Sequence, residues 1–175
     1  MSIKIGINGF GRMGRLTMRA LYEAGYVNGD INICHINDPA GDANTFAHLL
    51  NFDSVHGRWK FDAEERNGAI IIDDSEISFT QNRSIEDTDW SCCDLVIEAS
   101  GKFKSEESLQ EYLNQGVKRV VVTAPVKEEG VLNVVMGVNH DLYDKDKYPI
   151  VTAASCTTNC LAPAVKVIHE NLGIK

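Results

Sequence analysis

The sequence predicts an α/β protein built around a doubly wound parallel sheet. Short apolar runs rich in β-branched residues alternate with amphipathic helical patterns along the chain. The first run, 3–8, leads directly into the turn 9–14, which fits the pattern Gly-x-Gly-x-x-Gly. A small antiparallel hairpin is expected as an insertion, because the runs 69–72 and 76–79 flank the turn residues 73–75.

The start of the chain predicts a dinucleotide site of the Rossmann type. A helical pattern follows the glycine turn and ends near Gly25, and a second strand over 31–37 is followed by Asp38. Gly9 and Gly11 allow the backbone to approach a pyrophosphate at the helix N-terminus. Asp38 lies 24 residues after the last glycine of the motif. An acid there accepts both ribose hydroxyls of NAD and repels the 2′-phosphate of NADP, so we expect NAD as the cofactor.

The rest of the chain continues the alternation. Asp42 is expected to cap a helix over 43–50, and Ser105 is expected to cap a helix that runs through Leu113 and stops at Gly116. Further strands are expected at 95–97, 119–123, 133–138 and 150–152.

Small or polar residues follow the predicted strands and are expected to share one edge of the sheet. Asp38, Ser100, Thr123 and Cys156 each come just after a strand, and parallel strands bind ligands at their carboxyl ends. Arg83, after the hairpin, is a candidate contact for adenine or phosphate. A thiolate beside NAD suggests aldehyde oxidation, in which sulfur adds to the carbonyl, hydride leaves to the cofactor and a thioester remains.

The stretch 155–160 carries the candidate nucleophile, Cys156. An apolar helical pattern follows and closes with Gly173 as a C-cap, so Cys156 lies where unpaired backbone N–H groups favour a thiolate. Pro163 leaves two possibilities, because the helix either begins at Cys156 and bends or begins at Pro163 after a loop. His169 would lie roughly 20 Å away along one helix, too far to act as the base of this cysteine.

Composition excludes several classes of function. The chain has 25 acidic and 17 Lys or Arg residues, a net charge of −8, so no nucleic-acid partner is expected. Without a signal-peptide layout or a run of about 18 apolar residues, we expect no membrane association and a cytoplasmic location. Five irregularly spaced cysteines indicate free thiols. The pair Cys92–Cys93 does not form a CxxC motif, and with no second cluster of ligands in the sequence no metal site is expected.

Several motifs resemble those of the glyceraldehyde-3-phosphate dehydrogenases, and the resemblance covers essentially the whole chain. They are Gly-Ile-Asn-Gly-Phe-Gly-Arg at 6–12, Ile-Asn-Asp-Pro at 36–39, Phe-Asp-Ser-Val-His-Gly-Arg at 52–58, Met-Gly-Val-Asn-His at 136–140 and Ala-Ser-Cys-Thr-Thr-Asn-Cys-Leu-Ala-Pro at 154–163. The last motif is highly specific.

The resemblance implies a catalytic role for Cys156 and phosphate binding by Ser155 and Thr157. For NAD, it implies the glycine turn with Phe10, Arg12 and Met13 at the pyrophosphate, Asp38 at the ribose, and Arg83, Ser100 and Thr123 around the adenosine and nicotinamide halves. It further implies a glycolytic, cytoplasmic homotetramer that converts glyceraldehyde 3-phosphate and inorganic phosphate to 1,3-bisphosphoglycerate.

Members of this family carry a base histidine and a second domain after the nucleophile helix. We therefore expect residues 1–154 to form the NAD-binding domain and 155–175 to be the nucleophile motif and first helix of a truncated catalytic domain, with negligible turnover by this chain alone and some self-association.

Alternatives remain. One is a related sugar-phosphate or arsenate-resistance-associated dehydrogenase, suggested by the runs at 40–43 and 49–53, and another is a non-catalytic NAD-binding fragment. A cysteine hydrolase or redox protein unrelated to NAD would leave the glycine turn unexplained.

Overall fold

The structure, a computed structural model, describes residues 2–27 and 29–174. The helices and strands of these residues are β1 (Ile3–Asn8), α1 (Arg12–Glu23), β2 (Ile31–Asn37), α2 (Ala43–Asn51), β3 (Phe52–Asp53), β4 (Gly57–Arg58), β5 (Ala63–Arg66), β6 (Ala69–Ile72), β7 (Ser75–Thr80), β8 (Leu95–Glu98), α3 (Glu106–Asn114), β9 (Arg119–Val122), β10 (Leu132–Asn133), the short 3₁₀ helix η1 (His140–Leu142), β11 (Ile150–Thr152) and α4 (Cys156–Leu172).

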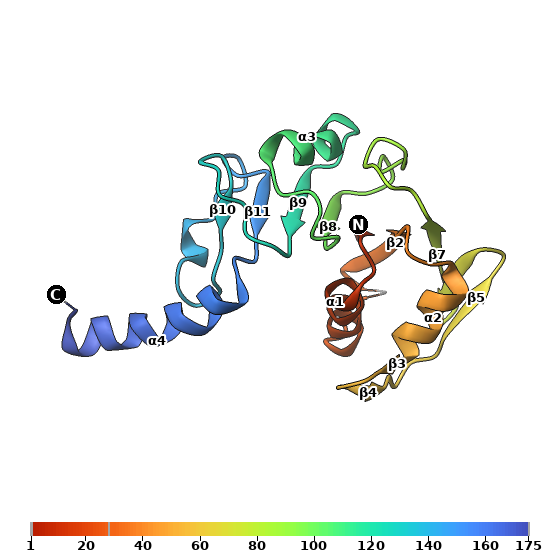
Figure 1. Ribbon diagram of the computed structural model, residues 1–175, viewed down its shortest axis with the longest axis horizontal. Coiled ribbons are helices and arrows are strands. Elements are labelled where there is room, and N and C mark those ends of the chain that lie inside the picture. The colour runs from red at the N-terminus through yellow and green to blue at the C-terminus, as the bar shows by residue number, and fades with distance from the viewer. Residues whose placement is uncertain (1, 28, 175) are drawn as a thin grey trace.

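The described part of the chain forms a nine-stranded sheet in the order β10-β11-β9-β8-β1-β2-β7-β6-β5. Figure 1 shows β10, β11, β9 and β8 side by side, with β2 and β7 beyond them. The strands from β10 to β7 in this order pair in parallel, and β1 lies between β2 and β8. The strand order reverses beside β1, so the predicted doubly wound parallel sheet is confirmed. Such a reversal is where open α/β sheets bind ligands.

The hairpin predicted at 69–79 is confirmed as antiparallel, and it is part of the main sheet. Asp73 and Asp74 both have positive φ, 46° and 63°, as a two-residue type I′ turn requires. The second hairpin strand, β7, pairs in parallel with β2. The outer strand β5 was not predicted, because Glu64, Glu65 and Arg66 carry no apolar alternation.

The strand predicted over 133–138 is wrong beyond its first residue. β10 ends at Asn133, and the chain then turns through Gly137, which has a φ of 81°. The Asn139 side chain accepts a hydrogen bond from the Val135 N–H at 2.7 Å and donates one to the Asn133 carbonyl at 2.9 Å. These two bonds close a turn where the apolar residues alone suggested a strand.

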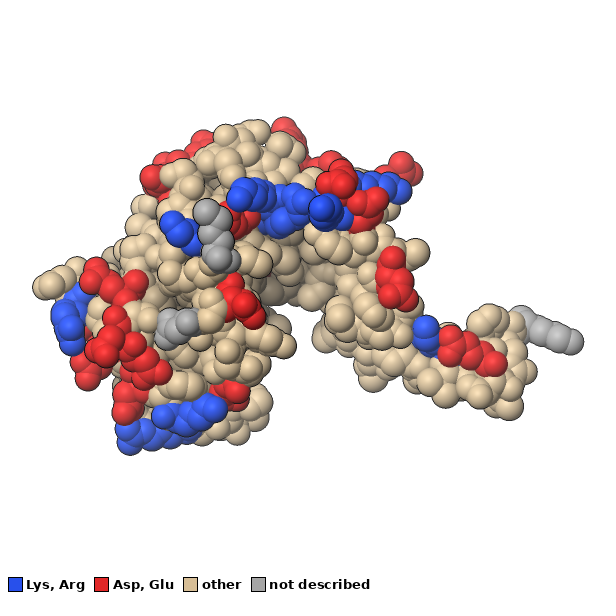
Figure 2. Space-filling model, turned by 180° about the vertical axis from the view of Figure 1, so that it is seen from behind, with Lys and Arg blue, Asp and Glu red and all other residues tan. Residues whose placement is uncertain are grey.

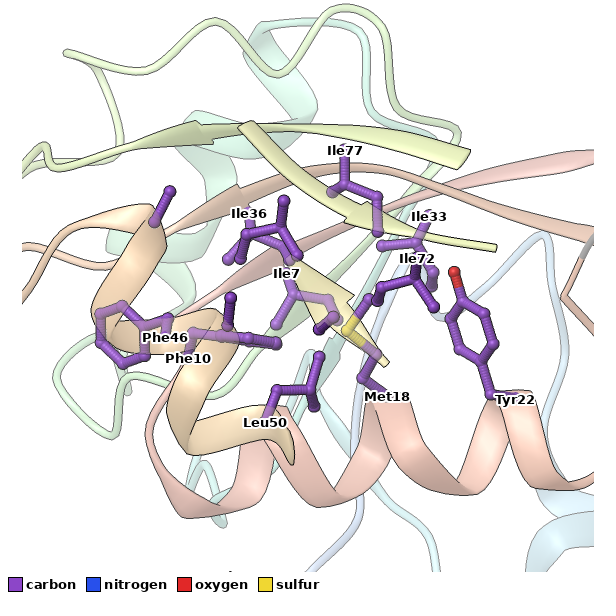
Figure 3. Packing of buried hydrophobic residues seen from close by; sticks show 14 of the residues in the cluster. Ile7, Phe10, Met18, Tyr22, Ile33, Ile36, Phe46, Leu50, Ile72 and Ile77 are labelled. Carbon is purple, nitrogen blue, oxygen red and sulfur yellow. The ribbon is translucent and has the colours of Figure 1, made fainter. Parts of the chain in front are cut away.

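Hydrophobic clusters lie on both faces of the sheet. On one face, α1 and α2 cover the strands, and Figure 3 shows their side chains pointing at isoleucines of β1, β2, β6 and β7. On the other face, α3 packs through Leu109 and Tyr112 onto Val96 and Val120, and all four side chains have no exposed surface. Each fully buried side chain of this size contributes about 1.5–3 kcal/mol relative to an exposed one.

The helix starts follow the capping residues in the sequence. Asp42 accepts a hydrogen bond from the Thr45 N–H at 2.8 Å at the start of α2, and Ser105 forms a capping box with Ser108 at the start of α3. α4 begins at Cys156 with Pro163 inside it, so the possibility that the helix begins at this cysteine, and not at Pro163 after a loop, is confirmed.

α4 extends away from the sheet (Figures 1 and 2). Several of its apolar side chains are exposed. Leu161, Val167 and Leu172 are 64%, 60% and 83% exposed, and no residue of the helix is buried. Among the described residues, no helix is both long enough and apolar enough to span a membrane.

Candidate functional site at the carboxyl edge of the sheet

Neighbouring parallel strands end level with one another, and backbone hydrogen bonds just past their ends hold this edge together. The bonds measure 2.7–3.0 Å. They run from Asp38 N–H to Thr80 O, Gly9 N–H to Asn37 O, Ala99 N–H to Asn8 O, Thr123 N–H to Glu98 O and Ala153 N–H to Val122 O. The glycine turn and the segment leading into α4 therefore lie along one edge of the sheet.

The three motif glycines have different surroundings. Gly9 has a φ of 89°, and a Cβ atom there would lie 2.3 Å from the Ser100 nitrogen. A Cβ on Gly14 would lie 2.2 Å from the Gly9 carbonyl oxygen, whereas a Cβ on Gly11 would have nothing within 4 Å. Gly9 and Gly14 thus allow close packing of the turn, and the open space at Gly11 fits the approach of a pyrophosphate to the start of α1.

Asp38 fixes the glycine turn through its carboxylate. One oxygen accepts a hydrogen bond from the Phe10 N–H at 2.7 Å, and the other accepts one from the Ala40 N–H at 2.8 Å. The ring of Phe10 is fully buried, so Phe10 can contribute to a ligand site only through its backbone. Each carboxylate oxygen keeps a further lone pair, which a ribose hydroxyl can use.

Arg12 and Met13 are exposed at the start of α1. The Arg12 guanidinium lies 3.2 Å from the Asp53 carboxylate. Hydrogen bonds from the His56 and Val55 N–H groups, with a smaller contribution from Arg12, lower the pKa of Asp53 to about 2. Asp53 is therefore a stable anion that holds a cation beside the glycine turn, a role that was not predicted for it.

A pocket of about 300 Å³ lies between the ends of β1, β2 and β8. It contains Arg83 and Ser100, two predicted site residues, and Lys102 bridges to the Arg83 carbonyl at 3.1 Å. The other lining residues are Asn8, Pro39, Ala40, Asn82 and Phe103. Most of these residues lie on loops that follow strands, and this position is the only feature of the sequence that suggests a ligand site there.

A larger hollow of about 600 Å³ lies over β9 and β11 and has a mostly apolar lining that includes Val121, Val151, Met136 and Tyr148. Arg119 and His140 also line it, but its surface is mostly apolar, so the smaller and more polar pocket is the better candidate for the cofactor.

Glu98 was not predicted to have a role, and it supports the loop that faces Gly9. It is 1% exposed and accepts hydrogen bonds from Asn8 at 2.9 Å, Tyr112 at 2.6 Å and the Ser100 N–H at 2.8 Å. The Ser100 hydroxyl also bonds to it. Burial raises the pKa of Glu98, while these hydrogen bonds act in the opposite direction.

The candidate nucleophile Cys156 is exposed as the first residue of α4. Ser155 caps the helix, since its hydroxyl accepts a hydrogen bond from the Thr158 N–H at 3.1 Å and lies 3.1 Å from the Thr157 hydroxyl. Ala154 has a φ of 54°, which is strained for a residue other than glycine. This strained residue sets the direction in which α4 leaves β11, and the sequence alone did not indicate it.

No hydrogen bond or ion pair of the described residues joins Cys156 to a histidine. His169 lies in the last turn of α4, where its Nδ1 accepts a hydrogen bond from the Ile174 N–H at 3.3 Å. Thr123, half-buried at the end of β9, completes the set of predicted positions along this edge.

Two profiles of one protein family match this chain. The family profile described as "Glyceraldehyde 3-phosphate dehydrogenase, NAD binding domain" matches residues 3–106. The profile described as "Glyceraldehyde 3-phosphate dehydrogenase, C-terminal domain" matches residues 155–175.

Similar curated proteins carry the same name. The chain is 51% identical to glyceraldehyde-3-phosphate dehydrogenase 3 of Nostoc sp., over 100% of this chain and 51% of the relative. It is 43% identical to the enzyme of Geobacillus stearothermophilus and 42% identical to that of Streptomyces coelicolor, each over 99% of this chain and 51% of the relative. The chain thus spans about half the length of these relatives.

Proposed function

Because the chain belongs to the glyceraldehyde-3-phosphate dehydrogenase family, we propose that it binds NAD at the glycine turn and that Cys156 is the nucleophile for oxidation of a phosphorylated aldehyde. The observation that carries this proposal is the continuous row of hydrogen-bonded strand ends, which links the turn at Gly9 to the segment before Cys156. Glyceraldehyde 3-phosphate is the proposed substrate of the whole protein, and 1,3-bisphosphoglycerate is its product.

In the proposed cofactor site, different residues contact different parts of NAD. Gly9 and Gly11 leave room for the pyrophosphate beside the exposed Arg12 and Met13, and Asp38 accepts hydrogen bonds from the ribose. The proposal also places the adenosine half in the pocket that contains Arg83 and Ser100, and the nicotinamide half near Thr123.

In the proposed reaction the Cys156 sulfur attacks the aldehyde carbon and forms a carbon–sulfur bond. The proton of the resulting hydroxyl passes to a base, hydride leaves the same carbon, and a thioester remains on the sulfur. Bound NAD supplies the hydride acceptor. Inorganic phosphate, held by the Ser155 and Thr157 hydroxyls, then attacks the thioester carbon. The carbon–sulfur bond breaks, the acyl phosphate is released and the Cys156 thiolate is restored.

We expect negligible turnover by this chain alone, because the described residues place no histidine in contact with Cys156. This supports a second candidate function, a non-catalytic NAD-binding unit. We also propose the division into residues 1–154 and 155–175, whose outermost residues 1 and 175 lie outside the described part. A cytoplasmic homotetramer acting in glycolysis is proposed for the whole protein by analogy with its relatives.

Calorimetric titration with NAD and with NADP tests the cofactor site. Unmodified protein should bind NAD at least tenfold more tightly than NADP, and Asp38→Asn should reduce this ratio. Asp42→Asn is the matched control, because asparagine caps a helix as well as aspartate does. No uptake of NAD, or an unchanged ratio in Asp38→Asn, would contradict the proposed site.

Alkylation by iodoacetate separates the catalytic proposal from the non-catalytic one. A nucleophile at Cys156 should be labelled much faster than Cys92 or Cys93, as mass spectrometry of the digested protein would show. Labelling of Cys156 no faster than that of Cys92 or Cys93, together with a rise in Tm on adding NAD, would favour the non-catalytic unit.

A further inference from the structure

Three cysteines meet away from the cofactor site. The Cys34 sulfur on β2 lies 3.4 Å from that of Cys93 and 3.8 Å from that of Cys92, and the last two are 3.7 Å apart. Cys93 is buried, Cys34 is partly exposed and Cys92 is exposed. The sequence predicts no metal site here because it shows no second cluster of ligands beside the Cys92–Cys93 pair, but β2 brings a third thiol to this pair.

The fold holds this cluster in place through Gly6 on β1. A Cβ on Gly6 would lie 2.8 Å from the Cys93 sulfur and 2.8 Å from the Trp90 ring, so the missing side chain makes room for both. The Cys93 N–H donates to the Trp90 carbonyl at 2.9 Å, which closes the turn before β8. Ser100 lies past the other end of β8, so the cluster is at the opposite end of this strand from the cofactor pocket.

The sulfur separations fit a shared metal ion better than a disulfide. A disulfide needs about 2.05 Å between sulfurs. Zinc–thiolate bonds of about 2.3 Å in tetrahedral geometry put sulfurs about 3.8 Å apart, and the observed range is 3.4–3.8 Å. A zinc ion bonded to all three sulfurs would lie roughly 1 Å out of their plane, which leaves a fourth position of the tetrahedron open.

We propose that Cys34, Cys92 and Cys93 form a three-thiolate binding site for zinc(II), with a water molecule in the fourth position. Thiolates select zinc over the harder magnesium and calcium ions. Binding replaces three S–H bonds with three Zn–S bonds and releases up to three protons to solvent. The resulting group carries one net negative charge, and the exposed Cys92 gives the ion a route to the site.

Zinc titration of the fully reduced chain, with cobalt(II) as a spectroscopic probe, tests the site. One equivalent of cobalt(II) should give sulfur-to-metal charge-transfer absorption, which zinc then displaces. Cys92→Ser and Cys34→Ser should weaken zinc binding at least tenfold. Cys160→Ser is the matched control, because Cys160 lies one turn after Cys156 on α4 and should leave the affinity unchanged.

Thiol protection gives a second readout that needs no variant. Zinc should slow the alkylation of Cys34 and Cys92 and leave that of Cys156 unchanged. The proposal is overturned if zinc protects Cys156 instead, if Cys160→Ser abolishes binding while Cys92→Ser does not, or if reduced protein forms a Cys34–Cys93 disulfide in air with zinc present. None of these results depends on NAD binding or on turnover.

Discussion

Replacing Gly9 with alanine should destabilise the fold much more than replacing Gly11. At Gly9 the new methyl group would meet the Ser100 nitrogen at 2.3 Å and its Cα at 2.4 Å, on a residue with a φ of 89°. The left-handed backbone costs about 1–2 kcal/mol for a non-glycine residue. Overpacking against backbone adds about 1–3 kcal/mol. We therefore expect a loss of about 2–5 kcal/mol in the free energy of unfolding.

Two control variants separate the cost of the left-handed backbone from the cost of overpacking. Gly116→Ala carries a similar φ of 97° with nothing within 4 Å of the new methyl, so it should lose only the backbone part. Gly11→Ala meets no neighbour and has a φ of −64°, so its free energy of unfolding should change by less than about 1 kcal/mol. NAD affinity should nevertheless fall in Gly11→Ala, because the methyl group enters the space proposed for the pyrophosphate.

Urea unfolding followed by circular dichroism measures these differences, and calorimetry measures NAD binding. If Gly9→Ala proved no less stable than Gly116→Ala, the close approach of the glycine turn to the loop after β8 would be refuted. If Gly11→Ala bound NAD normally, the proposed position of the pyrophosphate would be wrong.

Three further predictions concern Glu98, Cys34 and α4. Glu98→Gln puts an amide N–H among hydrogen-bond donors and should cost about 1–3 kcal/mol in urea unfolding at neutral pH. Burial raises the pKa of Glu98 above its ordinary 4.5, so the unmodified protein should gain stability relative to Glu98→Gln as the pH falls toward 4.5. Parallel plots of unfolding free energy against pH for the two proteins would contradict a raised pKa. Thiolate absorbance should reveal one group titrating near pH 7 that disappears in Cys34→Ser, since hydrogen bonds from Cys93 and Cys92 lower the pKa of Cys34 to about 7; an unchanged titration would disprove this. Light scattering should show association that rises with concentration and weakens in Leu172→Glu, because Leu172 is 83% exposed, and a monomer at all concentrations would count against this.

Local patterns in the sequence were enough to predict the central sheet and the glycine turn. β1 and β2 have the predicted bounds, because alternating β-branched residues and the following Gly9 and Asp38 are local signals. The strand predicted over 133–138 was wrong for a physical reason. The Asn139 side chain forms hydrogen bonds with the backbone of Asn133 and Val135, which a continued strand would use for pairing. The polar strand β5 had no apolar alternation to reveal it.

The parts of the candidate site that depend on contacts between distant residues could not be predicted. Cys34 and Cys92 are 58 positions apart, and only the pairing of β1 with β2 and β8 brings their sulfurs together. Glu98 follows three apolar strand residues, which is a weak hint of a buried acid. The donors from Asn8 and Tyr112 that satisfy it come from other elements.

A crystal structure of the chain with NAD would test most directly whether the cysteine and the cofactor share one crevice. The Cys156 sulfur and the nicotinamide C4 should lie within about 7 Å, because an aldehyde carbon between them must be about 3–3.5 Å from each. A nicotinamide ring on the far side of the sheet edge from Cys156, or NAD bound away from Gly11, would contradict the proposed function.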